Sequence, residues 1–228
     1  MIHTHALTFQ YPNGSKLTFP DVSLLPQGAV LLLSGPSGCG KSTWLALVAA
    51  LMLPTSGEVT VAGQHLTTLK KIAADAWRAK AIGFLPQKLH LSAALTVAQN
   101  LALAQWASGT REDQAAITQA LAALGVADLA QRLPSQLSGG QAQRAALARA
   151  VLLNPKVILA DEPTASLDDD AAANAVTLLL TTAQAQGATL VIATHDARVA
   201  AALEPVLAPQ NRLQMLTLPR RTDSDSSA

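Results

Sequence analysis

The sequence is poor in cysteine, in net charge and in long apolar runs, and each of these absences excludes a class of protein. A single cysteine, Cys39, excludes an internal disulfide and fits a reducing compartment. The 16 basic and 15 acidic residues leave a net charge of +1, without the clustered basic surface of a nucleic-acid-binding protein, so we expect no nucleic-acid partner. The longest apolar run, residues 44–53, is far shorter than the roughly 20 residues that cross a bilayer.

Residues 44–53 are therefore predicted to form a buried helix, and any membrane span must come from another chain. The first 14 residues have no basic stretch followed by an apolar run, so no signal peptide is expected. A length of 228 residues, half of them hydrophobic, favours one domain or a domain with an inserted lobe.

The N-terminal segments have the alternation of half-buried strands. It occurs in "IHTHALTF" (2–9) and in the short runs at 16–24 and 58–63, which are separated by Asn13-Gly14 and Pro20. Alternation with intervening turn residues is typical of antiparallel strands, so we predict an N-terminal antiparallel β subdomain.

Later strands have a different pattern, with every residue apolar except the last of each run. The runs are "AVLLLS" (29–34), "VILAD" (157–161) and "LVIAT" (190–194). Continuous apolar runs of this length indicate strands buried on both faces, and the helical stretches between them predict an α/β fold with a parallel sheet.

The strand pattern is missing between Gln87 and Asn154, where residues 95–108 and 111–126 have helical spacing and the second stretch ends at Gly125. We therefore expect one domain with an inserted helical subdomain. The predicted division is a core at 1–87 and 155–219, a helical lobe at 88–154 and a disordered tail at 220–228.

A phosphate-binding loop is predicted at "GPSGCGKST", which fits G-x-x-x-x-G-K-[ST] between a strand and a helix. Glycines there let successive backbone N–H groups point at a phosphate. Lys41 would reach the β- and γ-phosphates of ATP, and Ser42 would bind Mg²⁺. Cys39 in this loop is interpreted as a small filling side chain, with a redox switch as the alternative. The loop residues are Gly35, Pro36, Ser37, Gly38, Cys39, Gly40, Lys41, Ser42 and Thr43.

Two adjacent acids end the second apolar strand, in "VILADEP". Asp161 is predicted to hold Mg²⁺ through water, and Glu162 to orient and deprotonate a water that attacks the γ-phosphate. The alternative for such a pair is an ordinary turn or helix cap. The long buried strand that delivers both acids beside a phosphate loop favours the catalytic interpretation.

A second anion-binding feature lies at "LSGGQ" (137–141), where two glycines open an alanine-rich helix. The start of a helix offers free backbone N–H groups and the positive end of its dipole. No lysine accompanies it, so alone it would bind an anion weakly.

These motifs, in this order, resemble those of the ATP-binding cassette (ABC) ATPases, and the resemblance covers essentially the whole chain. "LSGGQ" looks like the family's signature motif; it follows the phosphate loop and Gln87 and precedes "VILADEP", the "SLD" turn (166–168) and His195. The resemblance implies a P-loop NTPase core with a mixed or parallel sheet. It also implies a head-to-tail dimer, in which the signature of one copy closes over the ATP held by the other.

The same resemblance implies roles for single residues. Tyr11 would stack on adenine, Gln87 would reach Mg²⁺ and the water, His195 would contact the γ-phosphate or hold Glu162, and Asp168 would sense the opposite site. The predicted catalytic residues are Glu162, His195 and Gln87, and the predicted Mg²⁺ ligands are Ser42, Gln87 and Asp161. The predicted nucleotide contacts are Tyr11, the loop 35–43, Ser138, Gly139, Gly140, Gln141 and Asp168. The other histidines, His3, His5, His65 and His90, lack the spacing of metal ligands.

The expected function is an ATP-hydrolysing subunit that powers a membrane transporter. "PTSGEVTVAGQHLTTL", "WRAKAIGFLPQ" and "LTVAQNLALA" look most like the lipoprotein-releasing and macrolide-exporter branch, with an importer ATPase or a soluble, non-transport ABC ATPase as alternatives. The implied partners are a second copy and an integral membrane permease, whose cytoplasmic helix would enter a groove near Leu89–Trp106. The implied location is cytoplasmic and peripheral, on the inner face of the cell membrane.

Overall fold

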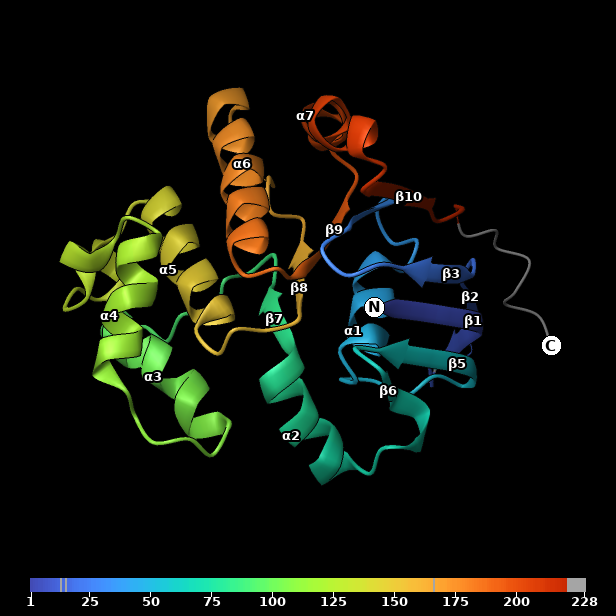
Figure 1. Cartoon of the computed structure of the whole chain (residues 1–228), viewed down its shortest axis with the longest axis horizontal. Helices are drawn as coiled ribbons and strands as arrows, with labels where there is room; N and C mark the ends of the chain where they lie inside the picture. Colours follow the sequence, from blue (N-terminus) through green and yellow to red (C-terminus); the bar gives the residue numbers. More distant parts are fainter. Residues whose placement is uncertain (13, 15, 166, 221–228) are drawn as a thin grey trace.

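The computed structural model describes residues 1–220 except 13, 15 and 166, and its N-terminal part is an antiparallel sheet (Figure 1). The sheet order is β2-β1-β5-β6, and β3 pairs with the beginning of β1, at Ile2 and Thr4. The strands are β1 (Ile2–Gln10), β2 (Lys16–Thr18), β3 (Val22–Leu25), β5 (Ser56–Val61) and β6 (Gln64–His65). The predicted N-terminal antiparallel subdomain is confirmed.

A second sheet, entirely parallel, forms the centre of the molecule in the order β10-β4-β9-β8-β7. Its strands are β4 (Val30–Ser34), β7 (Ile82–Leu85), β8 (Val157–Asp161), β9 (Thr189–Thr194) and β10 (Leu213–Thr217). The α/β fold with a parallel sheet, which the apolar runs predict, is therefore confirmed.

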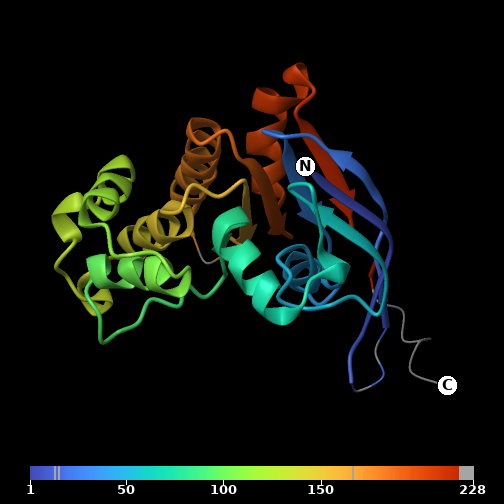
Figure 2. The same ribbon diagram turned by 60° about the horizontal axis from the view of Figure 1, so that its bottom comes forward.

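The central strands are buried on both faces, as their continuous apolar sequences predict. In β8, Ile158 and Ala160 face one hydrophobic cluster while Val157 and Leu159 face another. Successive side chains of a strand point to opposite faces, so an all-apolar strand fits only where both faces of the sheet are covered. One cluster includes residues of both sheets and of α1 (Lys41–Val48), the helix that lies between the sheets in Figure 2. The other cluster lies on the opposite face of the parallel sheet, under the helices that follow β7 in the chain.

Five α-helices follow β7 in the described part of the chain, and all five contribute residues to the second hydrophobic cluster. They are α3 (Val97–Ala107), α4 (Gln114–Ala123), α5 (Gly139–Val151), α6 (Asp169–Ala185) and α7 (Ala197–Leu207). Helices α3, α4 and α5 lie together on one side of the molecule, and α6 and α7 cover the parallel sheet (Figure 1). The remaining helical segments are α2 (Lys71–Ala81) and short 3₁₀ turns at Leu66–Thr68, Ala127–Leu129, Pro134–Gln136 and Ala208–Gln210.

Helix α5 approaches β7 very closely at Gly83. A Cβ atom on this residue would lie 2.4 Å from the Ala150 carbonyl oxygen and 2.9 Å from Pro155 Cγ. Only glycine leaves room for backbone against backbone at this point. Gly83 therefore sets how close the helix that begins at the "LSGGQ" motif lies to the central sheet.

Two sequence expectations differ from the structure. The helix predicted at 44–53 begins at Lys41 and ends at Val48, because Ala50 has a left-handed backbone (φ 52°) and the chain turns outward, leaving Leu51 and Leu53 exposed. Strands β7 and β10 were not predicted, since "IGFL" is very short and contains glycine, while "LQMLT" mixes polar and apolar residues at the sheet edge. The predicted disordered tail lies, from residue 221 onward, outside the described residues.

None of the helices in the described part of the chain combines the length and the apolarity that a bilayer crossing requires.

Candidate functional site

The phosphate loop connects β4 to α1 and takes a shape that only glycine allows at two positions. Gly35 has φ +147°, and a Cβ atom there would lie 2.7 Å from Cys39 Sγ and 2.8 Å from the Leu218 carbonyl oxygen. Gly40 precedes α1 with a left-handed backbone (φ 105°), so no side-chain cap covers the first N–H groups of the helix. The free N–H groups at this helix start provide the donors that a phosphate accepts from.

Lys41 is buried at the base of this loop. Its Nζ donates to the carbonyl oxygens of Gly35 (2.9 Å) and Pro36 (3.2 Å), and lies 3.3 Å from Glu162 Oε1. A buried ammonium needs such oxygens to offset its desolvation. The three oxygens hold the cation beside the loop, where phosphate oxygens could replace them.

Glu162 lies at the end of β8 in a strained backbone conformation. Its φ is +47°, an uncommon value for a residue with a side chain, and its N–H donates to the Ala193 carbonyl oxygen at 2.8 Å. Such strain is found mainly where surrounding structure fixes a functional side chain. The turn thus aims the carboxylate at the loop after β9.

The Glu162 carboxylate is held from three directions. Oε1 lies 2.8 Å from His195 Nδ1, and Oε2 accepts from Thr194 Oγ1 at 2.9 Å. Burial by itself would raise the pKa of this carboxyl, but the hydrogen bonds from His195, Thr194 and Lys41 outweigh it and keep the pKa below its ordinary value. Glu162 is therefore ionised at neutral pH, as a general base must be.

Asp161 has the environment expected of a cation ligand. Its side chain is buried, and its Oδ1 atom has no hydrogen-bond partner among the described residues. Burial raises the pKa of Asp161, and the charge of Glu162 raises it further, while Ser42 and Lys41 partly offset the shift. An unpartnered carboxylate oxygen beside a serine hydroxyl matches the hard oxygen ligands that Mg²⁺ prefers, so these residues fit the metal.

A cavity of about 370 Å³ brings most of the predicted site residues together. Residues from the N-terminal sheet, the phosphate loop, the segment after β7 and the ends of β8 and β9 all line it. The lining consists of Tyr11, Leu17, Ser37, Gly38, Gly40, Lys41, Ser42, Thr43, Gln87, Glu162 and His195. Gly35 and Pro36 line an adjoining hollow of about 290 Å³, which also contains His195.

Two residues of this region make packing contacts, and of the two Tyr11 also lines the cavity. Cys39 is buried in the cluster between the sheets. Tyr11 lies at the cavity mouth, with its hydroxyl 2.5 Å from Thr43 Oγ1 and its ring edge-on to Phe9. The Tyr11 ring is thereby tied to the phosphate loop.

The "LSGGQ" residues do not line the cavity of their own chain. Ser138, Gly139 and Gly140 are exposed at the start of α5. The Ser138 hydroxyl accepts from the Gln141 N–H at 3.2 Å, and the Gln141 side chain accepts from the Ser138 N–H at 2.9 Å, which forms a capping box. The rigid, exposed helix start is thus directed to solvent rather than to the phosphate loop beside Lys41.

Asp168 is also outside the cavity. Its side chain accepts from the Ala171 N–H at 2.8 Å and so caps α6. Ser166, in the same predicted turn, lies outside the described residues.

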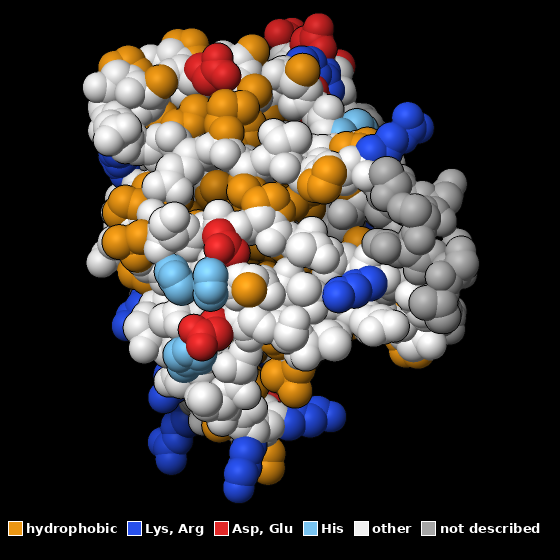
Figure 3. Space-filling view, turned by 90° about the vertical axis from the view of Figure 1, so that its right-hand side faces the viewer, with side chains coloured by type: hydrophobic (Ala, Val, Ile, Leu, Met, Phe, Trp, Pro, Cys, Tyr) orange, Lys and Arg blue, Asp and Glu red, His pale blue; other side chains and the backbone are white. Residues whose placement is uncertain are grey.

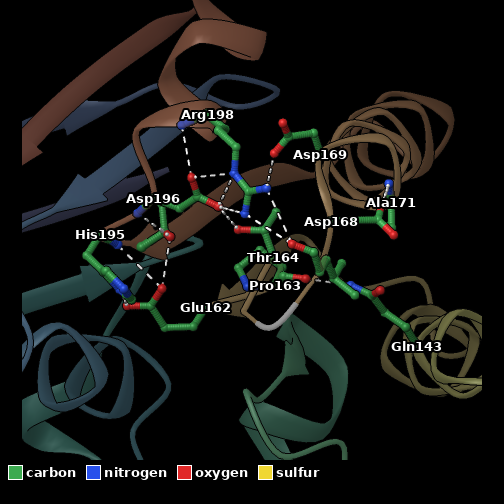
Figure 4. Close-up of polar contacts among 12 residues, drawn as sticks. Gln143, Glu162, Pro163, Thr164, Asp168, Asp169, Ala171, His195, Asp196 and Arg198 are labelled. Atoms are coloured by element: carbon green, nitrogen blue, oxygen red, sulfur yellow. Dashed lines mark hydrogen bonds and ion pairs between the residues drawn. The ribbon is translucent and has the colours of Figure 1, made fainter.

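A polar network that the sequence did not reveal joins the loop after β8 to the loop after β9 (Figure 4). Thr164 Oγ1 donates to Asp196 Oδ2 at 2.7 Å, and the Arg198 guanidinium donates to the same carboxylate. The hydrogen bonds from Arg198 hold the pKa of Asp196 well below its ordinary value. Thr194 was also missed, although it ends the apolar run "LVIAT" and so lies where a strand delivers a functional side chain.

The histidines of the N-terminal sheet are apart from this site. On that face, histidines lie beside acidic side chains (Figure 3), with His5 Nδ1 2.8 Å from Asp21 and His65 Nε2 3.7 Å from Glu58. Among the described residues, no three His, Cys, Asp or Glu side chains are grouped closely enough to hold a metal ion by themselves.

A second concavity, of about 680 Å³, lies between the end of α1, α2, β7, α3 and the end of α5. Its lining combines the apolar residues Leu51, Phe84 and Leu103 with Arg78 and Arg149. Trp106 is 52% exposed in the same helix as Leu103, so it is not a core residue, whereas Leu89 packs partly buried on the hydrophobic cluster. Leu103, Ala104 and Ala107 of α3 line this concavity, whereas neither Leu89 nor Trp106 does, so the groove predicted near Leu89–Trp106 stays a prediction.

Comparison with known proteins agrees with this geometry. A family model described as "ABC transporter" matches residues 21–165. The lipoprotein-releasing system ATP-binding protein LolD of Xanthomonas axonopodis pv. citri is 40% identical over 214 residues, which is 91% of this chain and 87% of that protein. The macrolide export ATP-binding/permease protein MacB of Salmonella paratyphi A is 38% identical over 86% of this chain, but the match spans only 31% of MacB.

A solved structure extends the likeness to the fold. The dimeric, post-hydrolysis ATP-binding cassette MJ0796 bound to ADP and Pi superimposes with a TM-score of 0.80 at 31% identity, covering 96% of this chain and 97% of that one.

Proposed function

This chain belongs to the ABC transporter family as one of its ATPases, and from that premise we propose that two copies pair head to tail to complete two ATP sites. The observation that carries the proposal is the position of Ser138–Gln141. They form a capped, exposed helix start outside a cavity that already contains Lys41, Glu162 and His195. In the proposed dimer, this helix start binds the γ-phosphate of the ATP held in the phosphate loop of the second copy.

In the proposed site, the N–H groups of the phosphate loop and Lys41 bind the β- and γ-phosphates of ATP. Phosphate oxygens replace the carbonyl oxygens of Gly35 and Pro36 around the ammonium. Tyr11, at the mouth of the same cavity, stacks on the adenine while its hydroxyl remains bonded to Thr43.

Ser42, Asp161 and Gln87 would hold Mg²⁺ in this arrangement. The unpartnered Oδ1 of Asp161 and the exposure of Ser42 and Gln87 to the cavity support this assignment. Mg²⁺, when bound, neutralises charge that develops on the transferring phosphoryl group.

Glu162 is the proposed general base. Its carboxylate accepts the proton of a water in line with the γ-phosphate, and His195 and Thr194 keep the carboxylate in that orientation. Asp168, at the cap of α6, is proposed to contact the opposite copy and so to report whether the second site is closed.

The proposed cargo class follows from the relatives. LolD and MacB are named for lipoprotein release and macrolide export, and we propose that this chain powers a transporter of that release or export type. The groove of about 680 Å³, lined by apolar residues together with Arg149 and the paired Arg78 and Asp75, is the proposed seat for a helix of the membrane permease. Residues 88–154 are proposed to form the helical subdomain that carries this groove wall, and the chain is proposed to sit peripherally on the cytoplasmic face of the membrane.

Mixing two inactive variants tests the head-to-tail arrangement. Ser138→Arg should block the site of the other copy, and Lys41→Ala should disable the site of its own copy. In a mixed dimer one site carries both defects and the other carries neither, so we expect the mixture to recover part of the wild-type ATPase rate.

Dimerisation of the mixture is measured alongside the rate. Mixed dimers that form but show no recovery would contradict independent composite sites. Recovery with Glu162→Gln in place of Ser138→Arg would not be expected, because Glu162 and Lys41 serve the same cavity and each composite site of that mixed dimer carries one defect.

A further inference from the structure

Arg198, near the start of α7, contacts acceptors on two separate loops (Figure 4). Its Nε and Nη2 donate to the Asp196 carboxylate at 3.0 and 2.8 Å, in the loop after β9. Its Nη1 donates to the Leu167 carbonyl oxygen at 3.3 Å, in the loop between β8 and α6, and to Oδ1 of Asp169, the first residue of α6, at 2.6 Å. A single guanidinium thus bridges the loops that end the two central strands.

In both loops, residues of the proposed site are sequence neighbours of the residues that Arg198 contacts. Asp196 directly follows His195, whose Nδ1 lies 2.8 Å from Glu162 Oε1. Leu167 and Asp169 flank Asp168, the residue proposed to meet the second copy. Asp196 also accepts from Thr164 at 2.7 Å, two residues beyond Glu162.

We propose that Arg198 is a positioning residue that couples the turn around Asp168 to the loop of His195. This proposal rests on the proposed function, because the turn matters only where a second copy touches it. When the second copy moves the turn, the guanidinium carries the displacement to Asp196, and so to the His195 side chain that orients Glu162.

The chemistry of arginine suits this role. Its planar guanidinium has five N–H donors in a fixed fork, so it can hold a carboxylate and further acceptors together without changing shape. Lysine offers a point charge on a flexible stem and cannot keep the same acceptors in fixed relation.

A purely stabilising role does not account for the arrangement. The Arg198 side chain is 41% exposed and that of Asp169 is 89% exposed. Exposed ion pairs contribute little to the stability of a fold. The Arg198–Asp169 pair therefore fixes the two loops relative to each other more than it holds the domain together, whereas the less exposed Arg198–Asp196 pair also contributes to fold stability.

The test compares Arg198→Ala, Arg198→Lys and Asp169→Asn with wild type in the full chain. Three quantities are measured: ATP affinity and binding stoichiometry of the monomer, kcat and KM of the ATPase, and the thermal unfolding midpoint. Arg111→Ala is the matched control, because Arg111 is an exposed arginine in the helical part of the chain.

We expect Arg198→Ala to lower kcat about tenfold, within the range of measured couplings between sites. ATP affinity and stoichiometry of the monomer should stay within about twofold of wild type. Arg198→Lys should recover only part of kcat, and Asp169→Asn should lower kcat to a smaller extent. The double variant Arg198→Ala/Asp169→Asn should be no slower than Arg198→Ala alone, because both changes remove one connection.

Unchanged kcat in Arg198→Ala, with active wild type, would overturn the proposal while leaving the proposed function intact. An additive loss in the double variant would equally show that Asp169 does not act through Arg198. If Arg198→Ala fails to fold, Asp169→Asn decides, since its side chain is 89% exposed and an exposed ion pair contributes little to stability. Normal kcat in that variant overturns the coupling. An inactive wild type that binds no ATP would instead refute the proposed function.

Discussion

The Lys41 ammonium is buried among two carbonyl oxygens and one carboxylate. These oxygens offset the free energy of desolvating the charge in the absence of ATP. Removing the ammonium by Lys41→Ala should weaken ATP binding by about 2–3 kcal/mol, because a charge-assisted contact to phosphate is lost. That corresponds to a roughly 30- to 150-fold increase in Kd. Equilibrium titration with a labelled ATP analogue measures this directly.

Lys71→Ala is the control for this titration, because Lys71 is an exposed lysine at the start of α2. It should bind the analogue as wild type does. Near-wild-type affinity of Lys41→Ala would show that the loop at 35–43 is not the phosphate site.

Asp196 makes fold stability depend on pH in acid. Because its pKa is depressed in the fold, the ionised form stabilises the native state above the unfolded value of about 3.9, and this contribution is lost as pH falls further toward the depressed value. Asp196→Asn should therefore lower the urea midpoint at pH 7. The deficit should shrink below about pH 4, where the wild-type carboxyl itself becomes protonated in the unfolded chain.

Urea unfolding at pH 7 and at pH 3 checks this, with Asp128→Asn, an exposed aspartate of the helical part, as the control. An equal deficit at both pH values would mean that Asp196 stabilises the loop by shape rather than by charge.

At the scale of secondary structure, the contact between α5 and β7 depends on one missing side chain. Gly83→Ala would place a methyl group 2.4 Å from the Ala150 carbonyl oxygen, so the helix or the strand must move. Overpacking of this kind costs about 1–3 kcal/mol, and more where backbone resists. We expect the free energy of unfolding to fall by that amount.

Gly140→Ala provides the matched control, because Gly140 is helical and a Cβ atom there would meet open space. It should leave stability unchanged or raise it by up to about 1 kcal/mol through helix propensity. Equal stability of Gly83→Ala and Gly140→Ala in denaturant titrations would contradict the close approach of α5 to β7.

The elements that the sequence predicted are those whose local pattern carries the physical reason for their structure. Strands β4, β8 and β9 are continuous apolar runs because both faces are covered, and each is followed by residues that line the cavity: the phosphate loop, Glu162 and His195. Strand β7 carries no such signal, since Gly83 is dictated by a helix more than sixty residues away. The end of α1 could not be predicted, because it depends on the left-handed backbone of Ala50, and an alanine gives no sequence signal for that conformation.

The same distinction applies to the site. Lys41, Asp161 and Glu162 were predicted because motif spacing and strand ends fix their positions. Arg198 and Thr164 could not be predicted, because their importance comes from contacts between residues about thirty positions apart. An arginine in an amphipathic helix has no sequence feature that distinguishes such a bridge from an ordinary solvated side chain.

At the scale of the whole molecule, a single copy contains a charged cavity and a separate, exposed signature helix, so two copies are needed to bring them together. Because both proposed ATP sites lie at the interface between the two copies, assembly of the dimer and hydrolysis of ATP are separable steps. In the proposed dimer, assembly would require the ATP phosphates and the facing motifs, whereas hydrolysis would additionally require an activated water. A change confined to Glu162 should therefore stop the second step and leave the first.

Glu162→Gln keeps the size of the side chain and its left-handed backbone, and removes the basic carboxylate. General-base assistance is typically worth 10²–10⁴-fold in rate, so turnover should fall close to background. Loss of a negative charge beside the γ-phosphate also relieves repulsion, which favours the closed dimer. Size-exclusion chromatography should show a dimer with ATP but not with ADP, lasting far longer than that of wild type, while Glu204→Gln, an exposed residue of α7, behaves as wild type. A monomeric Glu162→Gln that hydrolyses ATP normally would show that Glu162 only shapes the turn after β8 and that another group activates the water.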